Sequence, residues 1–457
     1  MTATLRLGEY VASFQERALE RDIVEKALMC LIDTMGLAIS ARTEPTAVAA
    51  LALCSQRQVT DKETATAWIN GVRLAPSEAA FANGVAAHAH FQDDTDHDSW
   101  THPGSLVPPA VVALAERQNA TLLATLRGLI AGYSVINWLG RDEVVARALI
   151  RRGFRTSPTL GTIAAAAGAA ALLGLGQDQA ASAVAISGSM TGGTLEPVRA
   201  GSDEWRVQNG RAAQGGLIAA CLASQGVIGA PESLDGPKGF LSTVAGMERA
   251  PDVWSAMPDP AIMRGIMCKP YATLGDNMPA AMAAQKLFQS GVDVHQIAAI
   301  EVTLWEPYTN YPGTNYKGPY ARLVQTQAST AFAVSTMLTQ GDITYEMGNT
   351  LRQDPLILDL VKKTTVIADK VGGALDSEVT LIMKDGRRLK AHSNEMSREL
   401  IFLNRSRTVS VFERRMLSLG ARPGAAQDFA SGLFDQLDQK GALPVGTIIR
   451  DMQALIS

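Results

Sequence analysis

SPTLGTIAAAAGAAALL, residues Ser157–Leu173, is the segment from which the fold class of this chain follows. Ser157 and Pro158 form a good pair of N-cap and first helical residue, so we predict a helix over Thr159–Leu173. The chain as a whole is 47% hydrophobic and only 19% charged, with abundant alanine and glycine. Low charge and small side chains suit helices that pack closely. The sequence therefore predicts a mainly helical core.

Helical spacing of apolar residues extends through most of the first 266 residues. A three- and four-residue repeat predicts a helix over Ile23–Ala38, and Ser77 is a candidate cap for a helix over Pro76–His90. Another helix is expected to begin near Ser105, where prolines are tolerated in the first turn. Two more predicted helices are Gln179–Ser187 and Arg211–Gln225.

The character of the sequence changes after Lys269. Alternating apolar residues predict strands over Ala299–Trp305, Thr364–Ala368, Ser377–Met383 and Arg387–His392. The Asp385-Gly386 pair between the last two strands is a strong hairpin signal. Helices are predicted between the strands, over Pro279–Gln289, Gln327–Leu338 and Pro355–Lys362.

We therefore predict a mainly α protein with an α+β part. A chain of 457 residues is too long for one simple core. Residues 1–267 are assigned to a helical domain and residues 268–405 to an α+β domain. Residues 406–457 return to helical spacing and are assigned to the helical domain, which makes the α+β unit an inserted lid.

The bulk charge and the cysteines narrow the possible partners. A formal charge of −4 and a pI near 5.9 give no basic footprint for nucleic acid or for an anionic membrane. The most apolar stretch, Thr162–Gly176, is too short and too rich in alanine and glycine for a membrane span. The four scattered cysteines fit reduced thiols, so we expect a cytoplasmic protein.

Four of the six histidines lie within fifteen residues of one another, between His88 and His102, together with four aspartates. Histidine titrates near neutral pH, and carboxylates set its charge and orientation. One interpretation of this segment is acid/base chemistry at a substrate bond. A second is a metal site built from His88, His90, Asp93 and His97. A solvated acidic loop with one or two core histidines is the third.

Two other segments carry candidate binding residues. Arg155 lies just ahead of a predicted helix N-terminus, an arrangement that favours binding of a carboxylate or phosphate. Lys269 and Tyr271 lie where helices give way to strands, and junctions between domains commonly form clefts. The tyrosine-rich loop 308–320 is interpreted as an ordinary surface loop, with a cleft-facing loop or an oligomer contact as alternatives.

Common cofactor and nucleophile motifs are absent from the sequence. It contains neither GxxxxGK[ST] nor a GxGxxG between a strand and a helix, and it has no GxSxG elbow. We therefore expect an enzyme of small anions that uses no cofactor.

Seven segments, in this order, resemble the MmgE/PrpD family along nearly the whole chain. They are Ile32–Gly36, Ala79–His88, Asp93–Thr95, His102–Gly104, Pro158–Thr162, Gly210–Ala213 and Lys269–Tyr271. The resemblance implies a helical domain built from both chain ends, an inserted α+β lid, a cleft between them and a homodimer. It also implies proton transfer next to a carboxylate, as in dehydration, decarboxylation or epimerisation.

The resemblance assigns roles to individual residues. His102 is expected to donate or accept the proton, and Asp93 and Thr95 to shape its surroundings. Lys269 is expected to bind a substrate carboxylate and to stabilise developing charge. The predicted catalytic residues are thus His102, Lys269 and Asp93, and the predicted substrate-binding residues are Thr95, Arg155, Arg206 and Tyr271.

Four positions that are polar in relatives differ here: Phe91, Arg155, Trp205 and Met278. Arginine hardly deprotonates, so Arg155 and Arg206 suit anion binding better than base work. The apolar replacements predict a substrate larger or less polar than a tricarboxylate.

The sequence thus predicts a lyase or an isomerase of a small carboxylated substrate, with a carbon–oxygen lyase (a dehydratase) ahead of a decarboxylase or an epimerase. Two rivals stay open. One is a catalytically idle family member that binds a small acid. The other is a metal-dependent hydrolase that uses the His/Asp cluster.

Overall fold

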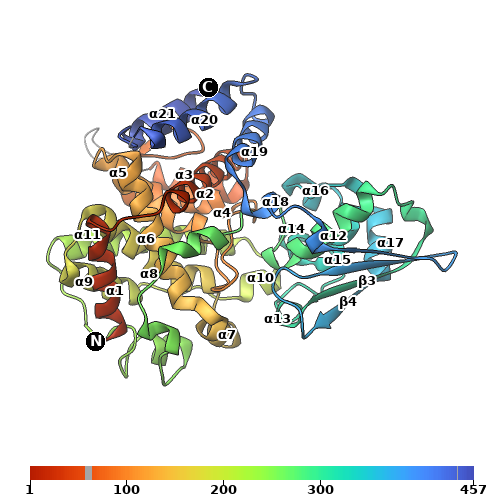
Figure 1. Cartoon of the computed structure of the whole chain (residues 1–457), viewed down its shortest axis with the longest axis horizontal. Helices are drawn as coiled ribbons and strands as arrows, with labels where there is room; N and C mark the ends of the chain where they lie inside the picture. Colours follow the sequence, from red (N-terminus) through yellow and green to blue (C-terminus); the bar gives the residue numbers. More distant parts are fainter. Residues whose placement is uncertain (57–63, 440, 457) are drawn as a thin grey trace.

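The computed structural model describes residues 1–56, 64–439 and 441–456. A large helical part lies beside a smaller part in which helices pack on a sheet, and the last helices lie next to the first ones in the larger part (Figure 1). The predicted class, mainly α with an α+β part, is confirmed.

The larger part contains the helices α1 to α11 and α19 to α21. Their bounds are α1 Ala3–Ala12, α2 Arg21–Ser40, α3 Pro45–Cys54, α4 Pro76–His88, α5 Val107–Arg117, α6 Leu122–Gly140, α7 Val144–Arg151, α8 Thr156–Leu173, α9 Gln177–Gly188, α10 Glu196–Ala200, α11 Glu204–Ser224, α19 Arg405–Ser418, α20 Ala425–Asp438 and α21 Val445–Ala454. A short two-stranded sheet, β1 Ala65–Thr66 and β2 Arg73–Leu74, was not predicted.

The two ends of the chain share one apolar core. That core contains buried side chains from Ala3 to Cys268 and again from Val409 to Met452. Arg415 of α19 forms a 2.6 Å ion pair with Asp33 of α2, which joins residues 382 positions apart in the sequence. The domain boundaries at 268 and 405 stay predictions.

The smaller part has a four-stranded sheet in the order β4-β3-β5-β6. Its strands are β3 Ile297–Trp305, β4 Thr364–Asp369, β5 Glu378–Met383 and β6 Arg388–His392. The β3–β4 pair is parallel and the other two pairs are antiparallel. Its helices are α12 Met278–Gln289, α13 Glu306–Thr309, α14 Leu323–Ala328, α15 Thr330–Gln340, α16 Tyr345–Thr350, α17 Pro355–Lys363 and α18 Glu399–Phe402.

The predicted hairpin is confirmed, since β5 and β6 pair across Asp385-Gly386 and Gly386 has φ of 85°. Two predicted helix starts were wrong. Ala75 caps α4, and Ser77 lies inside that helix. Arg155 is the N-cap residue of α8, and Ser157 is the second residue inside the helix, where its hydroxyl accepts a hydrogen bond from the His102 N–H. The helix expected over Gln327–Leu338 is broken at Ser329 into α14 and α15.

Two helical stretches are long and apolar enough to cross a membrane by length and composition alone, Leu122–Arg151 and Thr156–Leu173. Inside the protein, 83% and 89% of their most apolar windows are buried, which is what core helices also show. They are therefore weak evidence for a membrane span.

Glycines allow the core helices to touch. A Cβ on Gly210 of α11 would lie 2.5 Å from the Phe81 carbonyl oxygen of α4, and a Cβ on Gly84 would lie 2.9 Å from the Cα of Gly210. The small-residue character of the sequence thus serves close helix contact, as predicted.

We expect Gly210→Ala to lower the free energy of unfolding by about 1–3 kcal/mol, because the new methyl group overlaps backbone that cannot move aside easily. Urea denaturation would measure the loss. Gly432→Ala in α20 is the matched control, since no atom lies within 4 Å of its new methyl group. Equal stability of the Gly210 variant and the parent protein would contradict the close contact.

Candidate active site

The His/Asp segment forms the loop between α4 and α5, as predicted. Its chain reverses at Phe91 and Trp100, which both have positive φ. Thr95 pairs with Met267 through two backbone hydrogen bonds of 2.7 and 2.9 Å. This pairing places the loop directly beside the strand-like segment that leads into Lys269.

Two aspartates of the loop hold its shape from within. Asp94 accepts hydrogen bonds from the Gly104 N–H at 2.6 Å and the Tyr133 hydroxyl at 2.7 Å. Asp96 accepts from the Ser99 hydroxyl at 2.6 Å and from the Asn137 amide at 3.0 Å. Burial raises the pKa of Asp94 to about 7 and that of Asp96 to about 6. Much of the cluster is therefore interior structure and not a solvated loop.

His102 is held at both its backbone and its ring. Its N–H donates to the Ser157 hydroxyl at 3.1 Å. Its Nδ1 lies 3.2 Å from the Asp94 carbonyl and 3.1 Å from Thr95 Oγ1. Because a carbonyl can only accept, Nδ1 carries the proton and Nε2 carries the lone pair. Burial, and then the charge of Lys269, lower the pKa of His102 well below its usual value. The ring is a neutral base.

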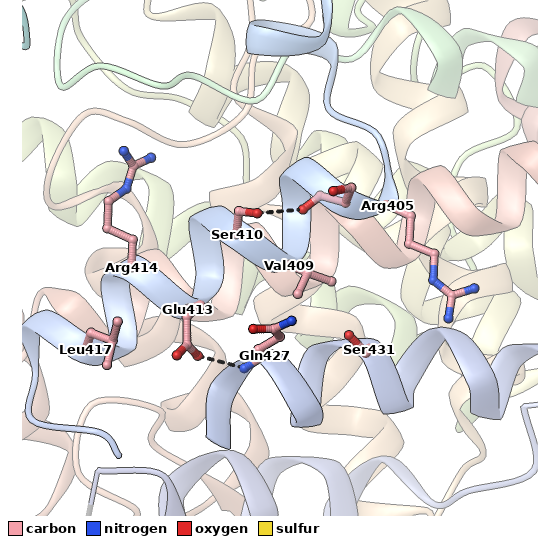
Figure 2. A pocket seen from close by; sticks show the side chains of 9 residues that line it. Arg405, Val409, Ser410, Glu413, Arg414, Leu417, Gln427 and Ser431 are labelled. Carbon is pink, nitrogen blue, oxygen red and sulfur yellow. Dashed lines mark hydrogen bonds between the residues drawn. The ribbon is translucent and has the colours of Figure 1, made fainter. Parts of the chain in front are cut away.

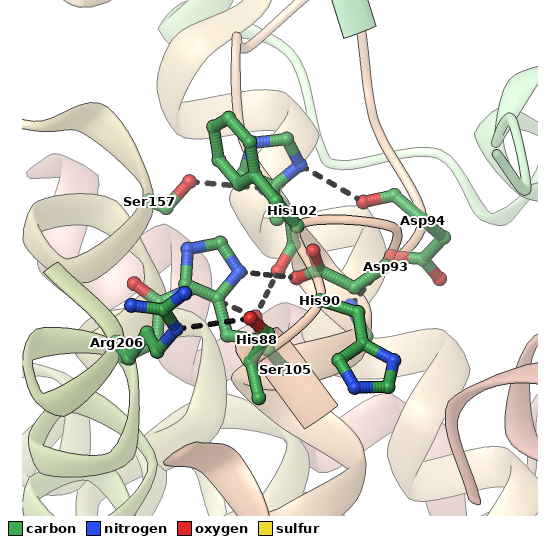
Figure 3. A network of polar contacts seen from close by, with 12 residues as sticks. His88, His90, Asp93, Asp94, His102, Ser105, Ser157 and Arg206 are labelled. Carbon is green, nitrogen blue, oxygen red and sulfur yellow. Dashed lines mark hydrogen bonds and ion pairs between the residues drawn. The ribbon is translucent and has the colours of Figure 1, made fainter. Parts of the chain in front are cut away.

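His88 lies beneath His102 and is joined to Asp93 (Figure 3). Arg155 donates from Nη2 to His88 Nε2 at 2.9 Å, so the His88 proton lies on Nδ1 and is donated to Asp93 Oδ2 at 2.8 Å. Burial lowers the pKa of His88 to about 4. Burial alone would raise the pKa of Asp93, but His88, His102 and Lys269 outweigh it and the pKa falls. The carboxylate is therefore ionised.

Lys269 lies in the same neighbourhood as His102, with Phe91 between them. Its Nζ donates to the Phe91 carbonyl at 2.5 Å and to the Thr273 carbonyl at 3.4 Å, and it lies 4.8 Å from the centre of the Phe91 ring. Burial lowers its pKa to about 8, although Asp93, Asp276 and Asp94 oppose the shift. The ammonium group is thus near the base, but its described donors point at backbone carbonyls.

Both parts of the protein contribute to one small cavity of about 30 Å³ beside His102. Its lining residues are Thr95, His97, Trp100 and His102 from the larger part, and Leu274, Gly275, Asp276, Tyr308 and Tyr311 from the smaller part. Of the predicted site residues, Thr95 and His102 therefore face the cavity. Asp93, Arg155 and Lys269 do not line it.

Arg206 and Tyr271 are not brought to this cavity. Arg206 donates to the Ala89 carbonyl at 2.9 Å and pairs with Asp203 at 2.9 Å. The Tyr271 hydroxyl donates to Gln285 Oε1 at 2.7 Å. Their substrate-binding roles stay predictions, without support from this geometry.

Three cavity residues were missed or undervalued. Tyr308 was assigned to a surface loop, but it is buried and its hydroxyl lies 2.5 Å from His97 Nδ1. His97 Nε2 is buried and has no hydrogen-bond partner among the described residues. Asp276 belongs to no motif that the sequence analysis identified. The clustering of tyrosines was the one sequence signal that pointed toward this wall.

The side chains of the metal-site alternative do not converge. His90 stacks on Tyr345 with ring centres 4.2 Å apart, and His97 pairs with Tyr308, whereas His88 pairs with Asp93. Among the residues that the structure describes, no three His, Cys, Asp or Glu side chains are grouped as metal ligands.

A larger surface groove, of about 650 Å³, lies elsewhere, between α19 and α20 (Figure 2). Arg405 on its wall is paired with Asp435 at 2.5 Å, and Glu413 accepts from the Gln427 N–H at 2.7 Å. None of the loop histidines lines it.

His90 offers a test of the burial of the loop. Burial, aided by Arg415 and Arg206, lowers the pKa of His90 to about 3. Between pH 6.5 and that value the unfolded chain binds a proton that the folded chain rejects, so His90 lowers stability as the pH falls. We expect His90→Phe, which keeps the ring on Tyr345, to gain about 2–3 kcal/mol relative to the parent protein between pH 7 and 4.5. Urea denaturation of both proteins at the two pH values would measure this gain. The same difference in free energy of unfolding between variant and parent at both pH values would contradict it.

Comparison with known proteins agrees with the resemblance seen in the sequence. A family model of the MmgE/PrpD N-terminal domain matches residues 5–251, more than half of the chain. A cis-aconitate decarboxylase-like protein of Aspergillus oryzae is 27% identical over 339 residues, which are 69% of this chain and 70% of the relative. Human cis-aconitate decarboxylase is 31% identical over 222 residues, 48% of this chain. Murine cis-aconitate decarboxylase is 34% identical over 172 residues, 37% of this chain. The matches span 45% and 34% of the two mammalian proteins.

Proposed function

Because this chain belongs to the MmgE/PrpD family, we propose that it is a cofactor-independent lyase or isomerase of a small carboxylated substrate. His102 is the base, and its Nε2 removes the proton from the carbon next to the carboxyl group. Within this class a carbon–oxygen lyase comes first and a decarboxylase or an epimerase second. The names of its relatives support a lyase, since they are a decarboxylase-like protein and two decarboxylases.

The observation that carries the proposal is the fixed tautomer of His102 beside a cavity lined by both parts of the chain. A general base needs a lone pair aimed at the substrate and a ring that is neutral at working pH. The Asp94 carbonyl fixes the lone pair on Nε2, and the lowered pKa keeps the ring neutral. Asp93, ionised below the ring, favours the imidazolium that forms when the proton is taken.

The cavity of about 30 Å³ holds a water-sized group and no acid of several carbons. Substrate entry therefore requires the two walls to separate. Phe91 and Trp205, which stand where relatives are polar, pack against each other with ring centres 4.8 Å apart and take up space. The expected preference for a larger or less polar substrate stays a prediction, as do the homodimer and the cytoplasmic location.

Solvent exchange tests the proposal without knowledge of the product. Malate, citrate, 2-methylcitrate and cis-aconitate would be incubated with the protein in D₂O, and proton NMR would follow the C–H signals next to each carboxylate. Loss of such a signal with at least one acid is expected. No exchange and no turnover with any of these acids would favour the alternative, a catalytically idle family member that binds a small acid. The packing of Phe91 against Trp205 and the hydrogen bond from Lys269 to a backbone carbonyl are the observations that agree with this alternative.

A further inference from the structure

Asp276 lies in the short helical turn Gly275–Asn277 that leads into α12, on the cavity wall that the smaller part contributes. Gly275 fits closely against the loop that carries the base, since a Cβ there would lie 3.2 Å from Thr95 Cγ2. Thr95 in turn contacts the His102 ring. The Asp276 carboxyl group and the His102 imidazole therefore line the same cavity from two different parts of the chain.

The surroundings of Asp276 favour its protonated form. Among the described residues no cation forms an ion pair with its carboxyl group. The titratable residues that line the cavity together with Asp276 are His97, His102, Tyr308 and Tyr311. Lys269 attracts the charge and Glu143 opposes it. Burial outweighs the attraction of Lys269 and the hydrogen bond from its own N–H, and it raises the pKa of Asp276 to about 7.

A neutral base and a protonated carboxyl group at one cavity are the two halves of an elimination. We propose, on the basis of the proposed function, that Asp276 is a catalytic acid that protonates the leaving hydroxyl oxygen after His102 has taken the carbon-bound proton. The substrate class is then a carboxylate whose hydroxyl group is on the carbon next to the acidic C–H.

The step balances. Nε2 of His102 first takes the carbon-bound proton, and the C–H electron pair stays on the substrate as an enolate-like anion that can take back a proton. That electron pair then becomes the new C=C bond. The C–O pair leaves with oxygen, which takes the proton of Asp276 and departs as water. The protein is left with an imidazolium and a carboxylate, and return of one proton from His102 to Asp276 through solvent restores the start.

Asp276→Asn tests the assignment, because it removes the acid and keeps the size of the side chain. With malate, citrate and 2-methylcitrate as probes, we expect dehydration to fall by about 10²-fold. Exchange of the C–H with D₂O should continue, since His102 is untouched. The chloride analogue of whichever acid reacts (chlorosuccinate for malate) should still be eliminated, because chloride leaves without a proton. The dehydration rate of the parent protein should fall above about pH 7, where Asp276 loses its proton, and the pH–rate profile of the variant should lack this fall.

Each other result counts against the assignment. Near-normal dehydration by the variant, or loss of exchange along with dehydration, would overturn the role of Asp276 as an acid. A parent protein that exchanges or decarboxylates these acids but dehydrates none would overturn it too, while leaving the proposed function standing. A parent protein that neither exchanges nor converts any of them would overturn both.

Discussion

His102→Asn should lower the rate of C–H exchange and of turnover by about 10³- to 10⁴-fold and leave the fold intact. The asparagine amide reaches the place of Nδ1, so it can still donate to the Asp94 carbonyl and contact Thr95. It has no atom at the position of Nε2. The base is therefore removed while the hydrogen bonds that hold the loop are kept. Steady-state rates with an acid from the exchange screen, together with urea denaturation, would measure both effects.

His90→Phe is the matched control, because His90 belongs to the same loop but stacks on Tyr345 away from the cavity. It should keep nearly full activity at pH 7. If the Asn variant kept more than a tenth of the parent rate, His102 would not be the base. Equal losses of activity in the two variants would mean that the structure of the whole loop, and not the His102 imidazole alone, determines the rate.

The local structure that could be predicted from the sequence depends on short-range signals. Asp385-Gly386 predicted a hairpin because a tight turn needs positive φ, and the alanine-rich segment around Gly168 predicted a core helix because small side chains allow close contact. Ser157 was misplaced as a cap because a serine looks the same whether its hydroxyl bonds its own helix or the backbone of a loop 55 residues away. Only the tertiary structure distinguishes these cases.

The site was predicted in part for a similar reason. His102 and Thr95 were found because they lie in one dense segment that resembles a family motif. Asp276 was missed, since it is one acidic residue in a turn and only the packing of two parts of the chain brings it to the histidine. The predicted anion-binding roles assumed that the cationic side chains were free to bind a substrate. A buried cationic group needs hydrogen-bond acceptors inside the protein, and Arg206 and Lys269 donate to backbone carbonyls.

Arg155→Met should lower the free energy of unfolding by about 3–5 kcal/mol, the largest stability loss expected here. The guanidinium is buried and donates to the Trp205 carbonyl at 2.6 Å, to Gln208 Oε1 at 3.2 Å and to His88 Nε2 at 2.9 Å. It also hydrogen-bonds Tyr311 of the smaller part. Methionine fills similar space but leaves buried acceptors without donors, and it removes a positive charge near Asp93.

Arg199→Met separates this effect from the loss of any arginine. Arg199 pairs with Glu196 at the surface, where the two side chains are 70% and 59% exposed, and water screens such pairs. Its loss should lie within the error of urea denaturation. The stability of Arg155→Lys should fall between those of the two methionine variants. An ammonium restores the charge near Asp93 but not the planar set of donors that reaches four acceptors at once. If Arg155→Met were as stable as Arg199→Met, the arginine would not be what holds His88 and Asp93 in place beneath the base.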